Sequence, residues 1–301
     1  MKKTILIALI SGIVINSYSQ QIPLYTQYMF NDFIINPAIA GTHDYFQAKS
    51  NNRYQWAGLV DHPFTAVLSV YGPFMNQDMG YGGYIFSDVT GPTSRTGLYG
   101  SYGYNIKVDR DIRLSFGLSL GLLQYKIDGT KIEFLDEELT AGKVQTAYLP
   151  DANIGVYVYA SNYYGGISAH QLLNNRMSIS SLENGQSEVF NRLRSHFFLH
   201  GGYKYNIDHD FDLEPTLLFK YVYPTPPQVD ISCKVIYQKM VWGALSYRTG
   251  DALAVMAGYN HMDKFYFGLA YDITTSKIRK TNAGTFELMV SAKFNKIKNT
   301  R

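Results

Sequence analysis

The sequence predicts an all-β fold, a transmembrane antiparallel β-barrel with about 14 strands, with 12 strands as the next alternative. The first observation is the stretch from Ile112 to Leu123, where large apolar residues alternate with small or polar ones. Successive side chains of a strand point to opposite faces, so one face of this stretch is continuously apolar. The stretch is about twice the common strand length of roughly 5–6 residues. This length is typical of a strand that crosses a bilayer at a tilt.

Composition is the second observation. The chain of 301 residues contains 26 Tyr, 17 Phe and 26 Gly, and only 17% of its residues are charged. Aromatic residues favour strands and membrane interfaces, and glycine relieves crowding in a curved sheet. No run of about 20 apolar residues is present, so a transmembrane helix is not expected. The single cysteine, Cys233, excludes an internal disulfide.

The third observation is that the three longest connections between the predicted strands are all odd-numbered, whereas the even-numbered connections are short. The long ones span residues 126–150, 170–195 and 273–284, and the short ones span 108–111, 161–162, 208–210, 238–239 and 260–263. Bacterial barrels have short periplasmic turns and longer external loops. A soluble sandwich has no reason to sort its loops in this way, so the pattern favours a barrel in the outer membrane of a Gram-negative bacterium.

The chain begins with an expected signal peptide at residues 1–19. Its apolar region, Ile5 to Ile15, follows two lysines, and Ser17-Tyr18-Ser19 supplies small residues for cleavage. Residues 20–42 form an irregular N-terminal segment with two prolines and no clean alternation. This segment is too apolar for a free tail and too irregular for a barrel strand. We therefore expect it to dock, either in the barrel lumen as a plug or on a periplasmic partner.

Residues 43–294 form the predicted barrel, and residues 295–301 form a basic tail. The candidate strands are 44–55, 63–73, 79–89, 95–107, 111–125, 152–160, 163–169, 196–207, 211–222, 228–238, 240–248, 252–260, 264–272 and 285–294. The first three alternate less cleanly than the rest.

The inward-facing row is rich in small residues and contains a few charges. Strand parity assigns these charged side chains to the lumen: Arg113, Lys204, Glu214, Lys220, Asp230, Lys234, Arg248 and Glu287. Small inward residues leave space in a barrel of this size, because about eight strands already enclose an interior that side chains just fill. The space must hold water, a loop, residues 20–42 or another polypeptide.

Several segments, in order along the chain, carry a resemblance to a known family. They are QYMFNDFIINPAIAGT (27–42), NRYQWAGL (52–59), GPTSRTGLYGSYGYNIKV (91–108), YYGGISAHQLLN (163–174), HFFLHGGYKYNI (196–207), LSYRTGDALAVMAGY (245–259) and GLAYDIT (268–274). With them, the chain resembles the PorP/SprF family of outer-membrane proteins, which is associated with the type IX secretion system and gliding motility of Bacteroidetes.

The resemblance implies a non-enzymatic barrel that serves the secretion or surface attachment of a large partner, such as an adhesin. It also implies contacts with components of the type IX secretion or periplasmic machinery and with outer-membrane lipid. The alternative is an outer-membrane porin or small-molecule transporter built on a similar barrel. Conductance of the purified protein without any partner would favour that alternative.

Candidate partner-binding residues lie in two places. In the N-terminal segment, either partner docking or packing as an internal plug is expected for Tyr28, Met29, Phe30, Asn36 and Pro37. Arg53 and Trp56 lie where the first strand meets the first external loop. They are expected either to anchor the barrel at the membrane interface or to contact a partner at the external rim.

No pattern predicts a catalytic, metal or cofactor site. His196 and His200 have the spacing of a helical zinc pair, but in a strand their Cα atoms stand about 13 Å apart. No local pattern brings a nucleophile, a base and an acid together. The basic residues behind the formal net charge of +3 are scattered, so no nucleic-acid partner is expected.

Overall fold

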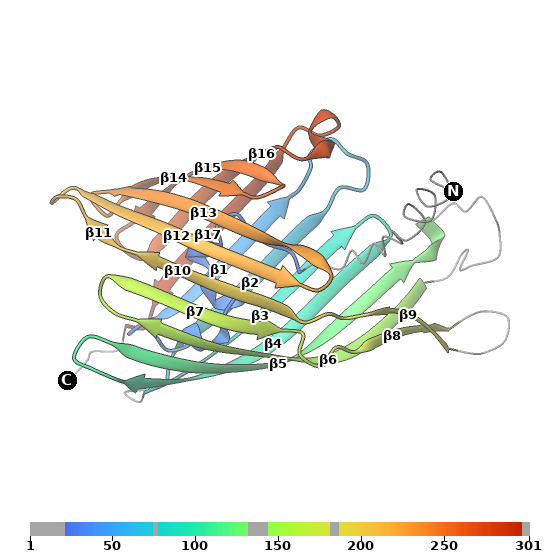
Figure 1. The fold of residues 1–301 in the computed structure, drawn as a ribbon, viewed down its shortest axis with the longest axis horizontal. Coiled ribbons are helices and arrows are strands. Elements are labelled where there is room, and N and C mark those ends of the chain that lie inside the picture. The colour runs from blue at the N-terminus through green and yellow to red at the C-terminus, as the bar shows by residue number, and fades with distance from the viewer. Residues whose placement is uncertain (1–21, 75–77, 132–143, 181–186, 297–301) are drawn as a thin grey trace, which may run out of the picture.

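The structure is a computed structural model that describes residues 22–74, 78–131, 144–180 and 187–296. Over these residues the chain forms a closed antiparallel barrel of 14 strands. Figure 1 shows how the strands are arranged. The predicted fold class and strand number are therefore confirmed. The expected signal peptide, residues 1–19, lies outside the described residues, as do residues 297–301 of the tail.

The barrel follows the order of the chain, and each strand pairs with its neighbours in sequence. Its first half comprises β1 (Phe46–Tyr54), β2 (Phe64–Pro73), β3 (Met79–Thr90), β4 (Thr93–Lys107), β5 (Arg113–Asp128), β6 (Val144–Tyr159) and β7 (Tyr163–His170). The second half comprises β10 (His196–Tyr203), its short continuation β11 (Tyr205–Asn206), β12 (Phe211–Val222), β13 (Thr225–Tyr237), β14 (Val241–Arg248), β15 (Ala252–His261), β16 (Phe265–Thr274) and β17 (Thr285–Phe294). Pairing of β1 with β17 closes the ring.

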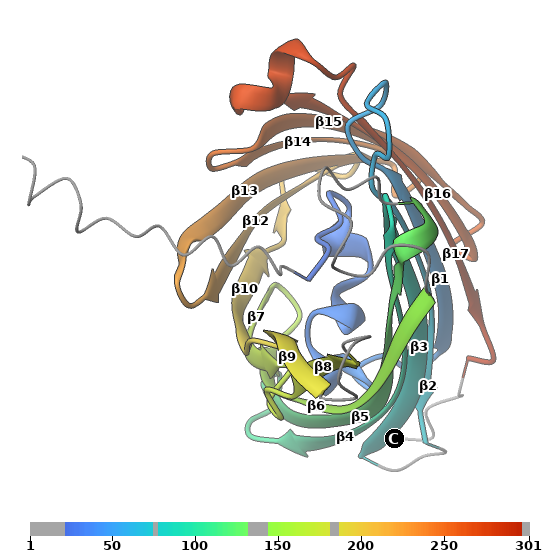
Figure 2. The ribbon, with the colours of Figure 1, turned by 90° about the vertical axis from the view of Figure 1, so that its right-hand side faces the viewer.

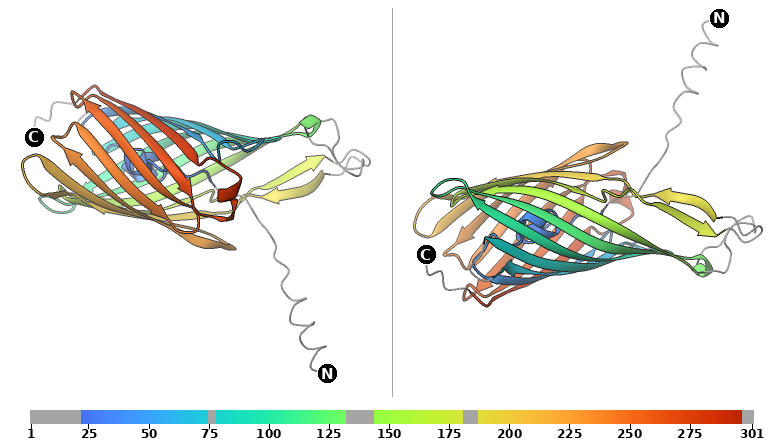
Figure 3. Two further views of the ribbon diagram at one scale, coloured as in Figure 1. Left: turned by 90° about the horizontal axis from the view of Figure 1, so that it is seen from above. Right: turned by 90° about the horizontal axis from the view of Figure 1, so that it is seen from below.

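Most strands lie within a few residues of their predicted ranges, but two features were not predicted. Strand β6 begins at Val144, eight residues before the predicted start at 152. The long connection between β7 and β10 contains a hairpin of β8 (Arg176–Ser180) and β9 (Ser187–Arg192). Figure 3 shows this hairpin extending beyond one end of the barrel. Two short 3-10 helices lie in other long connections, η4 (Gly129–Lys131) and η5 (Lys277–Lys280).

The longest connections all lie at one end of the barrel, which is the external end, together with short turns such as residues 91–92 and 223–224. The connections at the periplasmic end are short. Strand β5 shows how the wall is built. Phe116, Leu118 and Leu120 are exposed on the outer face, whereas Ser115 and Ser119 are buried. An apolar outer row in contact with lipid and a small, polar inner row are the pattern of a transmembrane barrel.

Residues 22–42, here called the lumen segment, lie inside the barrel, as Figure 2 shows. The segment contains three single-turn 3-10 helices, η1 (Tyr28–Phe30), η2 (Asp32–Ile34) and η3 (Pro37–Ile39). It begins at Ile22, beside the external ends of β10 and β12, and ends at the periplasmic start of β1. Among the described residues, no helix is long and apolar enough to cross a membrane.

Candidate functional site

The first half of the lumen segment is held by buried charged residues. Two backbone N–H groups donate to the carboxylate of Glu287 on β17, Thr26 N at 2.7 Å and Gln27 N at 3.0 Å. The hydroxyl of Thr26 donates to Asp272 on β16 at 2.8 Å. These bonds join residues that are more than 240 positions apart in the sequence. Because hydrogen bonds to a charged group are stronger than neutral ones, the two acids fix the backbone of the segment firmly.

Arg53 on β1 neutralises these two acids. Its guanidinium lies 2.7 Å from Asp272 Oδ2 and 3.2 Å from Glu287 Oε2, and it also donates to the Thr26 hydroxyl at 2.7 Å. At most 2% of each of the three charged residues is exposed. Buried charges are tolerated when they are paired and hydrogen-bonded. The three residues and the segment therefore form one interdependent cluster.

A second ion pair extends this cluster along the wall. Arg248 Nε lies 2.9 Å from Asp230 Oδ2, and its Nη1 lies 4.0 Å from Asp272. At the external end of the segment, Lys220 Nζ donates to the carbonyl of Ile22 at 3.1 Å. The N–H of Ile22 donates to His196 Nε2 at 3.2 Å, so this imidazole acts as a hydrogen-bond acceptor.

The second half of the segment is held by close contact with small residues. Cβ atoms added to wall glycines would overlap the segment, at Gly155 with the side chain of Asn36 and at Gly117 with the backbone of Ala38. The same holds for Gly80 and Gly103 on β3 and β4. Ser115 Oγ donates to the carbonyl of Ala38 at 2.5 Å. The segment therefore fits against this part of the wall because the side chains of the wall are absent or very small here.

Asn36 fixes the position of this second half. Its side chain accepts from Ala38 N at 3.0 Å, as an N-cap of η3, and donates to the carbonyl of Val156 on β6 at 3.0 Å. The residue is fully buried, and Pro37 follows at the first position of η3. An N-cap and a proline at the first helical position both favour the start of a helical turn. The chain can therefore turn here while its amide stays bonded to the wall.

The candidate residues of the lumen segment all lie inside the barrel. Tyr28, Met29, Asn36 and Pro37 are buried, and Phe30 packs against Trp242 with ring centroids 4.3 Å apart. The Tyr28 hydroxyl lies 3.2 Å from Thr216 Oγ1 on β12. In this arrangement these side chains contact the barrel wall.

Arg53 and Trp56 lie in different surroundings. We expected Arg53 at the membrane interface or at the external rim, but it is buried in the lumen. The reason is that the residue lies on the inner row of β1. Trp56 is half-buried in the external connection after β1, and its backbone N–H donates to Thr285 Oγ1 at 3.1 Å. Of the two, Trp56 is the one that lies at the external end.

The predicted lumen charges fall into two groups. Six of them are at most 6% exposed: Glu214, Lys220, Asp230, Lys234, Arg248 and Glu287. Arg113 is half-buried and pairs with Asp78 in a periplasmic turn at 3.2 Å. Lys204 is exposed and lies between β10 and β11, at the periplasmic end. Sequence reasoning missed Arg53, Asp272 and Lys49 as lumen charges. The apolar row of β16 points to Asp272, whereas both rows of β1 contain polar residues and leave Arg53 and Lys49 unassigned.

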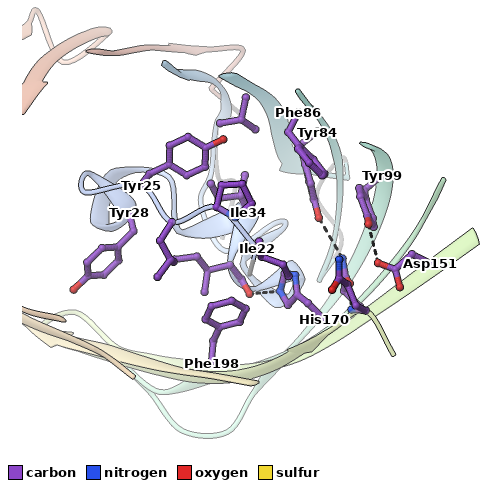
Figure 4. A pocket seen from close by; sticks show the side chains of 16 residues that line it. Ile22, Tyr25, Tyr28, Ile34, Tyr84, Phe86, Tyr99, Asp151, His170 and Phe198 are labelled. Atoms are coloured by element: carbon purple, nitrogen blue, oxygen red, sulfur yellow. Dashed lines mark hydrogen bonds between the residues drawn. The ribbon is translucent and has the colours of Figure 1, made fainter. Parts of the chain in front are cut away.

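The lumen segment leaves a small apolar cavity on its external side. Figure 4 shows the aromatic side chains that line it, with the segment residues on one side and the wall residues on the other. Its volume is about 50 Å³. The polar groups at its edge are bonded to one another, Tyr99 to Asp151 at 2.7 Å and Asn153 to Tyr84 at 3.2 Å. The external side of the segment is therefore closely packed and mainly apolar.

A much larger cavity of about 450 Å³ lies on the periplasmic side of the segment. Its lining includes residues of three periplasmic turns, namely Ser161, Asn162, Lys239 and Asp263. Partial burial raises the pKa of Asp263, but hydrogen bonding and charge interaction with Lys293 outweigh this and hold that pKa below its usual value. Asp263, which lies 2.7 Å from Lys293, is therefore ionised near neutral pH.

No group of three potential metal ligands occurs among the residues that the structure describes. His196 accepts from Ile22, whereas His200 stacks on Tyr157 with ring centroids 5.7 Å apart. The two imidazoles thus have separate contacts, and neither contact is to an acidic residue or to a cysteine.

Comparison with known families gives one match, and it spans most of the chain. Residues 17–292 match the family described as type IX secretion system membrane protein PorP/SprF. The resemblance expected from the sequence segments is thereby confirmed. Among curated proteins no match was found.

Solved structures with a similar fold are also barrels. A monoaromatic hydrocarbon channel, CymD, has a TM-score of 0.57 at 10% identity, covering 92% of this chain and 94% of that chain. A Pseudomonas aeruginosa FadL homologue has a TM-score of 0.53 at 10% identity, with 92% and 96% coverage. The Ralstonia pickettii toluene transporter TbuX has 0.51 at 9% identity, with 87% and 92% coverage. At these identities the likeness concerns the fold alone. The family match and the barrel fold together assign the chain to the outer membrane.

Proposed function

The chain belongs to the PorP/SprF family of type IX secretion system membrane proteins, and we propose that it is a non-enzymatic accessory of that system. In this role it is needed for the secretion or the surface attachment of one large partner protein, such as an adhesin. It works from the outer membrane and contacts machinery components from the periplasmic side and the partner from the external side.

The occupied lumen is the observation that carries this proposal. The lumen segment contacts both halves of the wall, through Glu287 and Asp272 on one side and through the small residues of β3 to β7 on the other. A channel for general diffusion needs an open lumen, whereas an anchor or adaptor needs two separate faces. The filled barrel supports the second role, in which the partner binds at an end of the barrel and does not pass through it.

The external end offers the surface for the partner. The β8–β9 hairpin extends beyond the barrel there, and Trp56 lies at the same end. Long external connections are where barrels of this kind carry specific recognition, because the wall itself faces lipid. We therefore place partner recognition at this end.

Removing the hairpin tests the proposal. Residues 176–192 are replaced by a short Gly-Ser turn in the chromosomal copy, and surface-attached and released proteins are compared with the wild type by mass spectrometry of both fractions. We expect one very large exported protein to be lost from the surface while the barrel remains in the outer membrane. An equal replacement of the η5 connection, residues 275–284, is the matched control, because it lies at the same end on the other side of the ring.

Two results contradict the proposal. One is a complete deletion of the gene that leaves every large exported protein secreted and attached as in the wild type. The other is partner-free protein that conducts ions in a planar bilayer as well as an open barrel does. The second result instead favours the porin or small-molecule transporter.

A further inference from the structure

The outer face of the barrel contains an apolar groove of about 630 Å³. The groove crosses five neighbouring strands, from β15 through β16, β17 and β1 to β2. Its external edge is a row of four exposed aromatic side chains that are paired across adjacent strands, Tyr54, Phe64, Tyr271 and Phe286. Aromatic side chains gather where a barrel wall meets the headgroups of the membrane. The groove therefore runs from the external headgroup level into the apolar part of the bilayer.

One polar side chain on the lipid-facing row, Asn52, lies in this groove. It is two residues from Tyr54 toward the periplasm, which is about 7 Å along the strand. At that depth the acyl chains of a lipid are joined to its headgroup. Asn52 Nδ2 donates to Ser50 Oγ at 3.2 Å, and within the described residues Asn52 Oδ1 accepts no hydrogen bond. Because a polar group without a partner is costly in lipid, this oxygen favours a lipid that carries a donor at the same depth.

Three exposed basic residues lie in the connection next to the external edge of the groove. Lys277, Arg279 and Lys280 belong to η5, between β16 and β17. None of them forms an ion pair within the part of the chain that the structure describes. The connection is fixed to the groove, because the Tyr271 hydroxyl donates to the carbonyl of Ala283 at 2.8 Å. Clustered basic side chains beside a membrane surface attract anionic lipid headgroups.

Acidic residues near η5 do not neutralise this cluster. The two neighbouring external connections contain one acid each, Asp61 and Asp251. The carboxylate of Asp251 pairs with Arg248 at 3.4 Å. Asp61 lies toward the β3–β4 turn, where a Cβ added to Gly91 would be 3.3 Å from the Asp61 Cβ. The three basic side chains therefore leave a local excess of positive charge beside the groove.

We propose that the groove and η5 together bind one molecule of lipid A, the phosphorylated and acylated anchor of lipopolysaccharide in the external leaflet. A phosphate of the lipid pairs with the basic side chains of η5. One acyl chain lies in the groove against Leu269 and Leu288, and an amide N–H or a chain hydroxyl of the lipid donates to Asn52 Oδ1.

Asn52 is what distinguishes lipid A from a phospholipid. Both carry phosphate and acyl chains, so η5 and the apolar groove suit either one. A phospholipid with ester-linked chains has no hydrogen-bond donor where the chains begin, whereas lipid A has amide-linked and hydroxylated chains there. The inference goes beyond the proposed function, since it concerns one specific lipid site on the wall and requires neither an exported nor a periplasmic partner.

Native mass spectrometry of the purified protein in detergent tests the proposal, because it counts bound lipid molecules directly. The protein is titrated with lipid A and, in parallel, with a phosphatidylglycerol that has ester-linked chains. Two variants alter the site, K277Q/R279Q/K280Q at η5 and Asn52→Leu in the groove. The matched control is K107Q/R110Q/K264Q, which removes the same number of exposed and unpaired charges from the periplasmic end.

We expect a saturable complex of one lipid A per barrel, and weaker binding of phosphatidylglycerol. The η5 variant should weaken binding of both lipids about tenfold, as the sum of three exposed charge contacts. Asn52→Leu should weaken lipid A binding about fivefold through loss of one hydrogen bond, and leave phosphatidylglycerol binding unchanged. The periplasmic control should bind both lipids as the wild type does. Unchanged phosphatidylglycerol binding by Asn52→Leu also shows that the variant is folded.

Three outcomes would overturn the proposal. They are the absence of a saturable complex with lipid A, equal losses in the η5 variant and the periplasmic control, and equal affinities of the two lipids that Asn52→Leu does not alter. The third outcome would make the groove a site for anionic lipids in general. The assay contains no exported partner and no machinery component, so its failure is separate from a failure of the proposed function.

Discussion

Two regions of the barrel wall hold the same lumen segment by different means. The wall of β1, β16 and β17 binds its first half through charges, with Glu287 and Asp272 accepting hydrogen bonds from the segment and Arg53 neutralising both. The wall of β3 to β6 binds its second half through shape, with glycines at positions that side chains would block. The difference lies in how each fails. A charged contact fails when one partner is removed, and a shape contact fails when an atom is added.

The two regions also differ in what they require of the sequence. On the charged side, removal of one charge leaves its buried partners uncompensated, whereas removal of the whole set is much less costly. On the shape side, a single methyl group is already too large, since packed interiors have almost no spare volume. The following variants are ordered from the largest expected effect to the smallest.

Arg53→Met tests the charged side and should have the largest effect. It leaves two buried acids without their cation, so we expect a loss of about 3–5 kcal/mol in the free energy of unfolding. Urea unfolding in detergent micelles measures it. The triple variant R53M/D272N/E287Q removes all three charges and should recover most of that loss. If the single and triple variants are equally stable, the charges do not act as one cluster.

Gly155→Val tests the shape side. The added side chain overlaps Asn36, and overpacking of this kind costs about 1–3 kcal/mol. Because the segment is displaced, we also expect ion conductance in planar bilayers, which the wild type should lack. Gly100→Val is the control, since nothing lies within 4 Å of a Cβ at Gly100 and this residue is exposed. Equal behaviour of the two valine variants would argue against a fit that depends on shape.

Ser115→Ala removes one hydrogen bond between the wall and the lumen segment. Loss of the bond to Ala38 should cost about 1 kcal/mol and increase hydrogen exchange of the amides of residues 36–41. Ser101→Ala removes a bond of similar kind, to the hydroxyl of Ser119, which lies within the wall between β4 and β5. It should leave exchange in the segment unchanged. If both variants raise hydrogen exchange in the segment equally, the bond between Ser115 and Ala38 does not hold the segment in place.

Alternation along the chain predicted the barrel and most strand bounds, because a strand that faces lipid on one side repeats every two residues over its full length. The position of Arg53 could not be predicted in this way. Its inner row on β1 also contains Gln47 and Asn51, and the outer row contains Ser50 and Asn52, so neither row is clearly apolar. Because neither row is apolar, the sequence does not indicate which face of the strand contacts lipid.

The site itself was harder to predict than the fold. A glycine such as Gly117 matches the general use of small residues in a barrel wall, and nothing nearby in the sequence indicates that Ala38 lies against it. Contacts of this kind join residues that are far apart in the chain and depend on closure of the whole ring. The β8–β9 hairpin was missed for a different reason, since its strands of 5 and 6 residues are too short to show the long alternation of a membrane strand.

The cluster around Arg53 has a consequence for how the protein is assembled. Arg53 and Glu287 are direct neighbours across the β1–β17 pair, which is the seam between the first and last strands of the ring. The lumen segment directly precedes β1, the first strand of this seam. Until it is there, Glu287 lacks the two N–H donors of Thr26 and Gln27. Placement of the N-terminal segment thus completes the hydrogen bonding of the seam, and we expect the β1–β17 pair to be weaker in a barrel that lacks it.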